Sequence, residues 1–331
     1  MPGMARIVLG LASSHTPQLN TPPEMWPLHG ENDKTNPWLF DRTGKRVSYD
    51  EALAAADPGL PARELTPEKQ RERHAAAQQA VARLQETLAE AAPDVIVVFG
   101  DDQAEIFPHQ FRPALMVHWG EMAPNMPDLF TRAPYEAGRQ AGWAYGPERA
   151  TIPIQPRLGK HIVDCLIDRG FDVASSTKLD NDMGLGHAYG FIFGRIMNGK
   201  TVPMVPVILN TLYPPNQPTP GRCYQLGQAV REAIESWPED ARVAVAGSGG
   251  LSHFIIDEEI DQRFISALRS KKAEDFARLP RERLESGTGE LRSWTAAAGA
   301  LEGLHLSFME YYPCYRSPAG TGVAMGFALW R

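Results

Sequence analysis

Cysteine is scarce in this sequence, where Cys165, Cys223 and Cys314 are the only three in 331 residues. They lie far apart, their number is odd and no pair has CxxC spacing, which argues against both a disulfide framework and a thiolate metal site. A long chain without disulfides is typical of a reducing compartment. We therefore expect a cytoplasmic protein in which the three thiols are small buried residues.

Long apolar runs are also missing. No stretch approaches the ~18 consecutive apolar residues of a transmembrane helix, so none is expected. Residues 1–11 do not resemble a signal peptide, because Arg6 is their only basic residue and no small-residue cleavage site follows. Positive charge is not in excess either, since the formal net charge is −7. We therefore expect neither nucleic acid nor a membrane as a partner.

What the sequence does contain is a series of short apolar runs separated by helical stretches. Near-continuous apolar runs of this length are typical of strands covered on both faces, and they occur at 7–11, 95–100, 202–209, 243–246 and 322–330. With 43% hydrophobic and 22% charged residues, the composition is that of an ordinary globular protein. We predict an α/β fold: one large domain, residues 1–331, with a mostly parallel or mixed central sheet flanked by helices.

The helix before the second strand has the clearest signals. Thr66 is a good N-cap, Pro67 suits the first helical position and Pro93 ends the pattern. Apolar residues recur on one face of this helix, at Ala77, Val81, Leu84 and Leu88. Further helices are predicted at 158–169, 186–197, 220–236, 258–269, 272–278 and 288–302.

Two segments interrupt the alternation of strands and helices. Segment 20–65 is rich in Pro, Asn and Asp, but it also contains Trp26, Trp38 and Phe40, which makes it too aromatic for a disordered linker. Segment 120–157 is similar and contains six prolines between positions 124 and 156. We expect both to be ordered excursions that form a lid or an oligomer contact.

Polar clusters follow three of the predicted strands. Ser13-Ser14-His15 follows the first strand, Asp101-Asp102-Gln103 the second, and the glycine-rich segment 247–253 follows the strand at 243–246. Sites in α/β sheets form at the carboxyl ends of strands. The sequence therefore predicts one pocket to which all three clusters contribute.

Four residues in or near these clusters could carry chemistry. His15 could bind a metal, and His253, with an ordinary pKa near 6.5, suits proton transfer beside glycines that let a ligand approach. His187 opens a predicted helix, and Glu290 also lies at a helix start. Taken singly, each has a plainer interpretation: a hydrogen-bonding loop histidine, a turn cap or an acid that suits the helix dipole.

Together, the segments resemble a known family. Ser13-Ser14-His15-Thr16-Pro17, Gly249-Gly250-Leu251-Ser252-His253 and Gly289-Glu290 are similar to motifs of the class III extradiol ring-cleavage dioxygenases, the LigB-type superfamily, whose model member is the beta subunit of protocatechuate 4,5-dioxygenase. The likeness continues at 213–215 and 221–227, so it spans nearly the whole chain. Segments 22–26 and 100–103 resemble a branch that includes 3-O-methylgallate dioxygenases.

The resemblance implies an iron(II) site. His15 matches the first iron-binding histidine, Glu290 the iron-binding carboxylate and His253 the acid/base histidine beside the metal. His187 matches a histidine that contacts the substrate. The second iron-binding histidine is expected in the turn after the second strand, where this chain has Gln103.

Gln103 is therefore the predicted third ligand, although an amide oxygen is a weaker donor than imidazole. Its neighbours Asp102 and Glu105 could complete the site instead, or His74 or His109 could approach. Alternatively, the metal site is weakened or lost.

The family resemblance implies a non-haem iron(II)-dependent dioxygenase that opens the ring of a catechol- or gallate-type phenolic acid with O2. It also implies a homo-oligomer, with a dimer as the expected state. Two alternatives remain on the same fold: another metal-dependent enzyme, such as a zinc hydrolase or lyase, or a non-catalytic binding protein. Fold alone does not choose among them.

Overall fold

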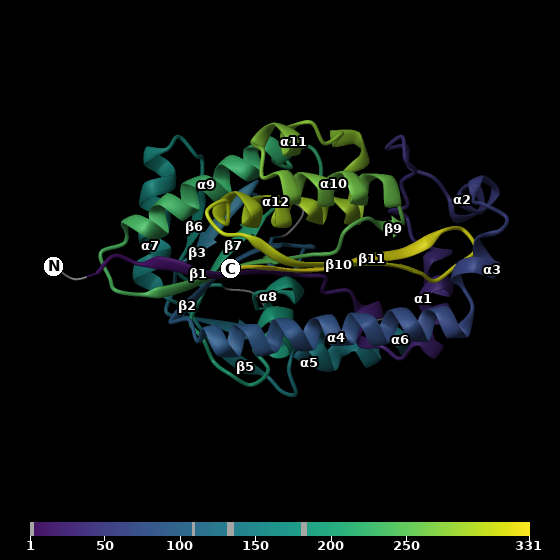
Figure 1. Ribbon diagram of the computed structural model, residues 1–331, viewed down its shortest axis with the longest axis horizontal. Helices are drawn as coiled ribbons and strands as arrows, with labels where there is room; N and C mark the ends of the chain where they lie inside the picture. The colour runs from purple at the N-terminus through teal and green to yellow at the C-terminus, as the bar shows by residue number, and fades with distance from the viewer. Residues whose placement is uncertain (1–2, 108–109, 131–135, 180–183) are drawn as a thin grey trace.

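The computed structural model describes residues 3–107, 110–130, 136–179 and 184–331, and within them one α/β domain is built on a large mixed sheet (Figure 1). The predicted fold class is thus confirmed. The sheet has nine described strands: β1 (Arg6–Ser13), β2 (Val95–Asp101), β3 (Leu115–His118), β6 (Ala174–Ser176), β7 (Met204–Leu209), β8 (Arg242–Ser248), β9 (His253–Ile255), β10 (Leu306–Tyr315) and β11 (Thr321–Trp330).

The centre of the sheet is parallel and its flanks are not. Strands follow the order β10-β11-β1-β8-β2-β7-β3-β6, and β1, β8, β2 and β7 run parallel to one another. The hairpin β10–β11 joins β1 in the antiparallel sense, and β3 is antiparallel to β7. Strand β9 pairs with β11 and places His253 opposite Val323. The parallel strands therefore bring their carboxyl ends to one edge, as the sequence predicts for the site.

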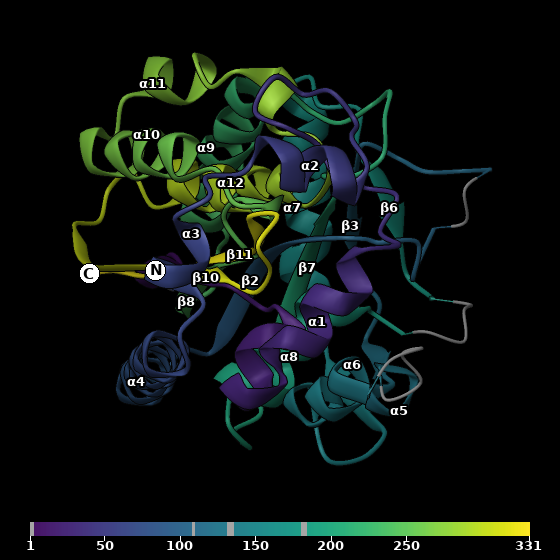
Figure 2. The same cartoon turned by 90° about the vertical axis from the view of Figure 1, so that its right-hand side faces the viewer.

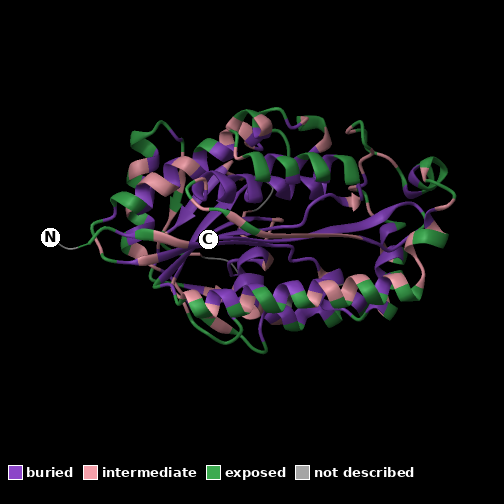
Figure 3. Cartoon of the chain, viewed as in Figure 1, coloured by how far each residue is buried: buried purple, intermediate pink, exposed green. Residues whose placement is uncertain are grey.

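Helices cover both faces of the sheet. On one face lie α7 (Pro156–Asp168), α9 (Pro220–Ser236), α10 (Glu258–Ser270), α11 (Ala273–Ala277) and α12 (Leu291–Ala300); on the other lie α4 (Pro67–Ala91) and α8 (His187–Phe191), as Figure 1 shows. Each layer buries the side facing the sheet and exposes the other (Figure 3). None of the helices within the described ranges has the length and apolar character needed to span a bilayer.

Strand β2 shows why the predicted strands read as continuous apolar runs. Val95, Val97 and Phe99 pack into the core beneath α7, α9 and α12, whereas Ile96 and Val98 pack into the core against α4 and α8. Successive side chains point to opposite faces, and here both faces are covered. A polar residue within such a strand would lie in one core or the other.

The predicted features of α4 are confirmed. Thr66 Oγ1 accepts a hydrogen bond from the backbone of Lys69 at 3.2 Å, and Pro67 occupies the first turn. The helix ends at Ala91, followed by Ala92 in the left-handed region. Two other predicted helices are interrupted. The 186–197 helix is α8 followed by a π-helical turn (Ile192–Ile196), and the 288–302 helix is a 3-10 turn (Ser286–Glu290) followed by α12.

The two interrupting segments contain short elements. Segment 20–65 holds a 3-10 turn (Pro23–Met25), α1 (Trp26–Asp33), α2 (Tyr49–Ala55) and α3 (Leu60–Glu64), which gather at the end of the molecule toward which the parallel strands point (Figures 1 and 2). Within 120–157, the described residues include β4 (Met122–Asn125), α5 (Pro127–Phe130), α6 (Glu136–Gln140), a 3-10 turn (Ala141–Tyr145) and β5 (Ala150–Pro153). The predicted role of either segment as a lid or an oligomer contact stays a prediction.

A buried ion pair fixes α1 to the C-terminal hairpin. Asp33 accepts two hydrogen bonds from Arg316, both at 2.7 Å, and a third from Thr321. Asp33 is 1% exposed and Arg316 9%, so each charge depends on the other to remain in the interior. The excursion is thereby anchored beside β11.

Candidate metal centre and active site

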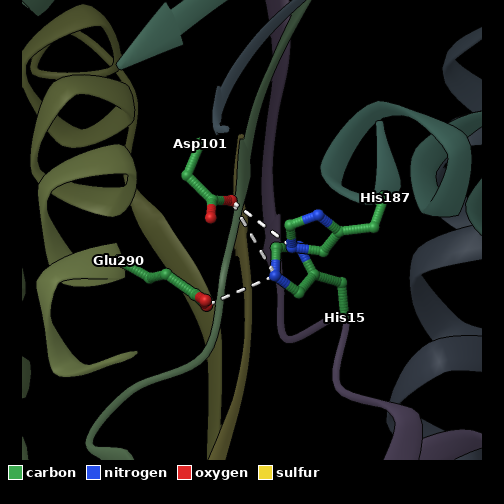
Figure 4. Close-up of side chains that lie close together, drawn as sticks. All are labelled: His15, Asp101, His187 and Glu290. Atoms are coloured by element: carbon green, nitrogen blue, oxygen red, sulfur yellow. Dashed lines mark ion pairs between the residues drawn. The ribbon is translucent and has the colours of Figure 1, made fainter. Parts of the chain in front are cut away.

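Side chains from four separate elements converge at the carboxyl edge of the sheet. His15 follows β1, Asp101 is the last residue of β2, His187 opens α8 and Glu290 caps the start of α12 (Figure 4). One ligand atom from each lies within 4.8 Å of all the others, and these four residues are called the metal group below. Two of the three polar clusters predicted at strand ends, those that contain His15 and Asp101, therefore share one site.

His15 has a fixed tautomer. Its Nδ1 lies 3.0 Å from Ser248 Oγ, and that hydroxyl donates its own proton to the carbonyl of Ala188 at 2.8 Å. Ser248 Oγ can therefore only accept from Nδ1–H, which leaves the lone pair on Nε2. This Nε2 atom is buried, 3.3 Å from Glu290 Oε2 and 3.9 Å from Asp101 Oδ1.

His187 is held in the same way by a carboxylate. Its Nδ1 lies 2.9 and 2.8 Å from the two oxygens of Glu105, and its backbone N–H donates to Glu105 Oε1 at 2.9 Å. The opposite ring atom, Nε2, lies 3.8 Å from Asp101 Oδ1. The rings of His15 and His187 meet edge to face, with centroids 4.5 Å apart.

The two carboxylates are buried, and that of Asp101 is partly unsatisfied. Asp101 is fully buried, and among the described residues its Oδ1, like His15 Nε2, has no hydrogen-bond partner. Glu290 is 1% exposed and its Oε2 accepts from the backbone N–H of Gly250 at 2.6 Å. Buried polar atoms without partners are rare in folded proteins and point to a group that binds there.

His15 Nε2, Asp101 Oδ1 and Glu290 Oε2 face one another as hydrogen-bond acceptors, so a cation is required between them. The cation could be a metal ion or a proton on one of the imidazoles. Imidazole nitrogens and carboxylate oxygens suit iron(II), manganese(II) and zinc. Bonds of ~2.0–2.2 Å place neighbouring ligand atoms ~3–4 Å apart, which matches the 3.3, 3.8 and 3.9 Å separations. The residues therefore fit a divalent transition metal.

The ionisable groups of the site shift one another's pKa values. Burial raises the pKa of Asp101 to about 6 even though His187 opposes this, whereas His253 and His15 outweigh burial and hold the pKa of Glu290 well below its usual range. Burial alone would lower the pKa of His187, but the carboxylates of Glu105 and Asp101 raise it to about 10. Negative charge is thus concentrated where the ligand atoms meet, and it attracts a cation.

Gln103 reaches the site through its amide nitrogen. Nε2 donates to Asp101 Oδ2 at 3.3 Å and to Glu290 Oε1 at 3.1 Å. This leaves Asp101 Oδ1 and Glu290 Oε2 to face His15 and His187. The ligand role of Gln103 stays a prediction.

The other residues considered for the missing ligand lie elsewhere or have other partners. Asp102 accepts hydrogen bonds from the backbone of its own loop, at Glu105, Ile106 and Phe107. His74 pairs with Gln78 and lies against Trp26, outside the metal group. His109 lies outside the described residues.

His253 lies beside the metal group with its ring fixed. Nδ1 lies 2.7 Å from the carbonyl of Leu251, so it carries a proton, and Nε2 lies 3.2 Å from Glu290 Oε1. Thr288 Oγ1 accepts from the backbone N–H of His253 and donates to its carbonyl. A Cβ on Gly287 would lie 2.1 Å from the imidazole, so only glycine allows this approach. The nitrogen that can exchange a proton therefore faces the site.

A second buried carboxylate supports the segment that carries His253. Asp261, fully buried in α10, accepts from the backbone and hydroxyl of Ser252 at 2.8 and 2.7 Å and from Tyr311 at 2.9 Å. Burial raises the pKa of Asp261 to about 7, although the hydrogen bonds from Ser252 oppose this, and the nearby Asp257 raises it further. The residue before His253 is thus fixed to α10.

Replacing Asp261 with Asn should flatten the pH dependence of stability. The pKa of Asp261 rises from its ordinary 3.8 to about 7 on folding, so its contribution to stability is present below pH 3.8 and is lost as the pH rises through 7. Relative to Asp261→Asn, the wild type should lose up to about 1.4 kcal/mol per pH unit across this window. Urea unfolding from pH 5 to 8 measures the difference.

The exposed Asp50, in the first turn of α2, offers the matched control. Asp50→Asn removes one exposed carboxylate and so controls for the change in net charge. Parallel stability curves for the wild type and Asp261→Asn would show that Asp261 does not titrate differently in the folded state.

Segment 20–65 also reaches this region. Phe40, Asp41 and Arg42 line a pocket together with His253 and Thr288. Arg42 is largely exposed, and its Nε lies 3.7 Å from Asp257 Oδ1. One wall of the pocket beside His253 therefore comes from segment 20–65.

Comparison with known proteins gives one family match and several relatives. A family model described as the catalytic LigB subunit of aromatic ring-opening dioxygenase matches residues 58–325. A 2,3-dihydroxyphenylpropionate/2,3-dihydroxicinnamic acid 1,2-dioxygenase from Comamonas testosteroni is 29% identical over 174 residues, which are 53% of this chain and 47% of that protein. A protein of the same name from a Rhodococcus species is 30% identical over 199 residues, 58% of this chain and 55% of that protein.

Gallate dioxygenase from Pseudomonas putida is 31% identical over 184 residues, 50% of this chain and 51% of that protein. The chain thus spans about half the length of the curated relatives it matches.

Proposed function

The chain belongs to the family of the catalytic LigB subunit of aromatic ring-opening dioxygenase, and from that premise we propose that it opens an aromatic ring with O2 at the site described above. The observation that supports this most is the position of His253. Its Nε2 lies 3.2 Å from Glu290 Oε1, and Glu290 is grouped with His15 and Asp101, whose Nε2 and Oδ1 atoms are buried and lack hydrogen-bond partners among the described residues. A proton acceptor beside a metal group is what ring opening of a dihydroxy compound requires.

Iron(II) is the metal we propose. His15, Asp101 and Glu290 would hold it, with a further ligand from the same group. When bound, iron(II) would supply the redox chemistry with O2 and open coordination positions for substrate oxygens. The carboxylates offset the positive charge of the ion, and Gln103 keeps one oxygen of each carboxylate turned away from it.

His253 is proposed as the general base and acid. The neutral ring accepts a hydroxyl proton at Nε2, while Nδ1–H stays on the carbonyl of Leu251 and fixes the ring plane. Burial alone would lower the pKa of His253, but Glu290 outweighs it and raises the pKa above its ordinary value. The same nitrogen can return its proton later in the reaction.

The proposed substrate is a catechol- or gallate-type phenolic acid. The relatives are named for a dihydroxyphenyl acid and for gallate. Adjacent hydroxyls on one ring are the feature that a metal with neighbouring open positions can bind. The homodimer and the cytoplasmic location expected from the sequence stay predictions, which sedimentation and cell fractionation would test.

O2 uptake by iron-loaded protein tests the function. Protein loaded anaerobically with iron(II) should consume one O2 per ring when given the right member of a panel of catechol, 2,3-dihydroxyphenylpropionate, protocatechuate, gallate and 3-O-methylgallate. The product should carry both oxygen atoms, which mass spectrometry detects as a gain of 32 mass units from ordinary O2 and of 36 from ¹⁸O2. Protein loaded with zinc is the control and should consume none, because zinc has no redox chemistry.

Absence of O2 uptake across the whole panel would contradict the proposal. Activity of the zinc-loaded protein without O2 consumption would instead support a hydrolase or lyase.

A further inference from the structure

Two imidazoles, and not one, face the carboxylates of the metal group, and the second comes from α8. We propose that His187 binds the metal through Nε2 and that Glu105 is the positioning residue that holds it there. The proposal rests on the metal-dependent function above and names one of its ligands. It gives the site two nitrogen ligands, from His15 and His187, and two oxygen ligands, from Asp101 and Glu290.

The hydrogen bonds of His187 decide which ring atom is free. Both oxygens of Glu105 lie within 2.9 Å of Nδ1, and an ionised carboxylate can only accept. Nδ1 therefore carries a proton, and in the metal-bound form the lone pair belongs to Nε2. Metal-binding histidines commonly donate their other N–H to a carboxylate or carbonyl, which fixes the ring and makes the bound nitrogen more basic. His15, with Nδ1 on Ser248, shows the same arrangement.

The contact between Glu105 and His187 is closely packed. Gly186 has φ +80°, in the left-handed region, and a Cβ there would lie 2.4 Å from Glu105 Oε2. The carboxylate therefore occupies the space that a side chain at position 186 would fill. Asp102 accepts from the backbone N–H of Glu105 at 3.0 Å and so holds the loop that carries it. A surface ion pair would need none of these constraints.

Gln103 contacts the carboxylates of the metal group as a hydrogen-bond donor and not as a metal ligand. Its amide nitrogen donates to Asp101 Oδ2 and Glu290 Oε1, the carboxylate oxygens that are not the nearest ones to His15 and His187. Reversing the amide would place its oxygen against two carboxylate oxygens, which is unfavourable. Gln103 therefore orients the oxygen ligands as a hydrogen-bond donor, and the second nitrogen ligand comes from His187 at the start of α8.

Metal affinity separates these roles without reference to activity. Iron(II) titrations by calorimetry under argon should show binding weakened at least about 100-fold in His187→Ala and about 10–100-fold in Glu105→Gln. Gln103→Ala should weaken binding less than either. The matched control is His74→Ala, which removes a part-buried histidine outside the metal group and should bind as the wild type does.

X-ray absorption of the iron(II)-loaded protein counts the imidazole ligands directly. Two are expected in the wild type and one in His187→Ala. At saturating iron, Glu105→Gln should still show two, because it loses the orienting partner and keeps the ligand. If His187→Ala does not fold, the number of imidazole ligands in the wild type and the iron(II) affinity of the near-isosteric Glu105→Gln still test the proposal.

Three outcomes would overturn the proposal: a single imidazole in the wild type, wild-type affinity in His187→Ala, or a larger loss in Gln103→Ala than in His187→Ala. Its failure is distinct from that of the proposed function. Ring opening that survives in His187→Ala with unchanged affinity contradicts only the ligand assignment. Two imidazoles in a protein that opens no ring would contradict only the function.

Discussion

His15→Ala should abolish tight iron(II) binding and lower kcat/KM for ring opening at least about 1,000-fold, since loss of a partner behind a ligand already costs ~10–100-fold. His15 Nε2 lies between the two carboxylates, 3.3 Å from Glu290 Oε2 and 3.9 Å from Asp101 Oδ1. Alanine would leave two buried carboxylates facing each other with one nitrogen ligand fewer. Anaerobic iron(II) titration followed by O2 uptake with the active substrate measures both effects.

Ser248→Ala provides an intermediate step for the same prediction. It keeps the His15 ring but removes the acceptor for Nδ1–H, so iron(II) affinity should fall about 10–100-fold. His118→Ala is the control, because His118 is equally buried in β3 but pairs with Ser176 outside the metal group. An affinity of His15→Ala within tenfold of the wild type would exclude His15 as a ligand.

The strands that could be predicted from the sequence are those formed by a run of consecutive apolar residues. In β2 and β8, a run of consecutive apolar residues alternates between two cores, so the apolar run lies within the strand. Strand β10 carries no such run, because most of its residues are only half-buried and Pro313 lies within it. It exists because β11 pairs with it along its whole length, at the edge where a proline is tolerated. Strands β6 and β9 have three residues each, too few for a periodic pattern.

The position of the site was predictable, and its full composition was not. The rule that sites form at strand carboxyl ends places His15 and the His253 segment together, and the structure also brings in His187, Glu290 and Gln103. The sequence places Asp101 only in a polar cluster. It ends an otherwise apolar buried strand. A carboxylate at the carboxyl end of such a strand was the available signal for Asp101.

The partner of His187 had no local signal. Glu105 and His187 are 82 residues apart, and nothing between them indicates that the loop after β2 reaches the start of α8. The pairing depends on how two loops pack over the sheet. Burial without His187 would raise the pKa of Glu105, and the imidazole instead lowers it, so the carboxylate is stable there only because the fold supplies its partner.

His253→Ala is expected to separate catalysis from metal binding. His253 contacts Glu290 Oε1 at 3.2 Å but is not part of the metal group, so iron(II) affinity should stay within about tenfold of the wild type. Without the base at Nε2, kcat should fall about 100–10,000-fold. Single-turnover ring opening in protein preloaded with iron(II) and substrate measures the loss.

A role in proton transfer makes a sharper prediction than a loss of rate. A nitro-substituted analogue of the substrate has a more acidic hydroxyl and needs less help from a base, so the ratio of wild-type to His253→Ala rates should be smaller for it than for the parent compound. A purely structural role would give the same ratio for both compounds, because a displaced metal group slows them equally. His305→Ala, an exposed histidine beside β10, is the control and should leave both rates unchanged. Equal ratios for the two compounds would therefore assign His253 to the architecture of the site and leave the base to be found elsewhere.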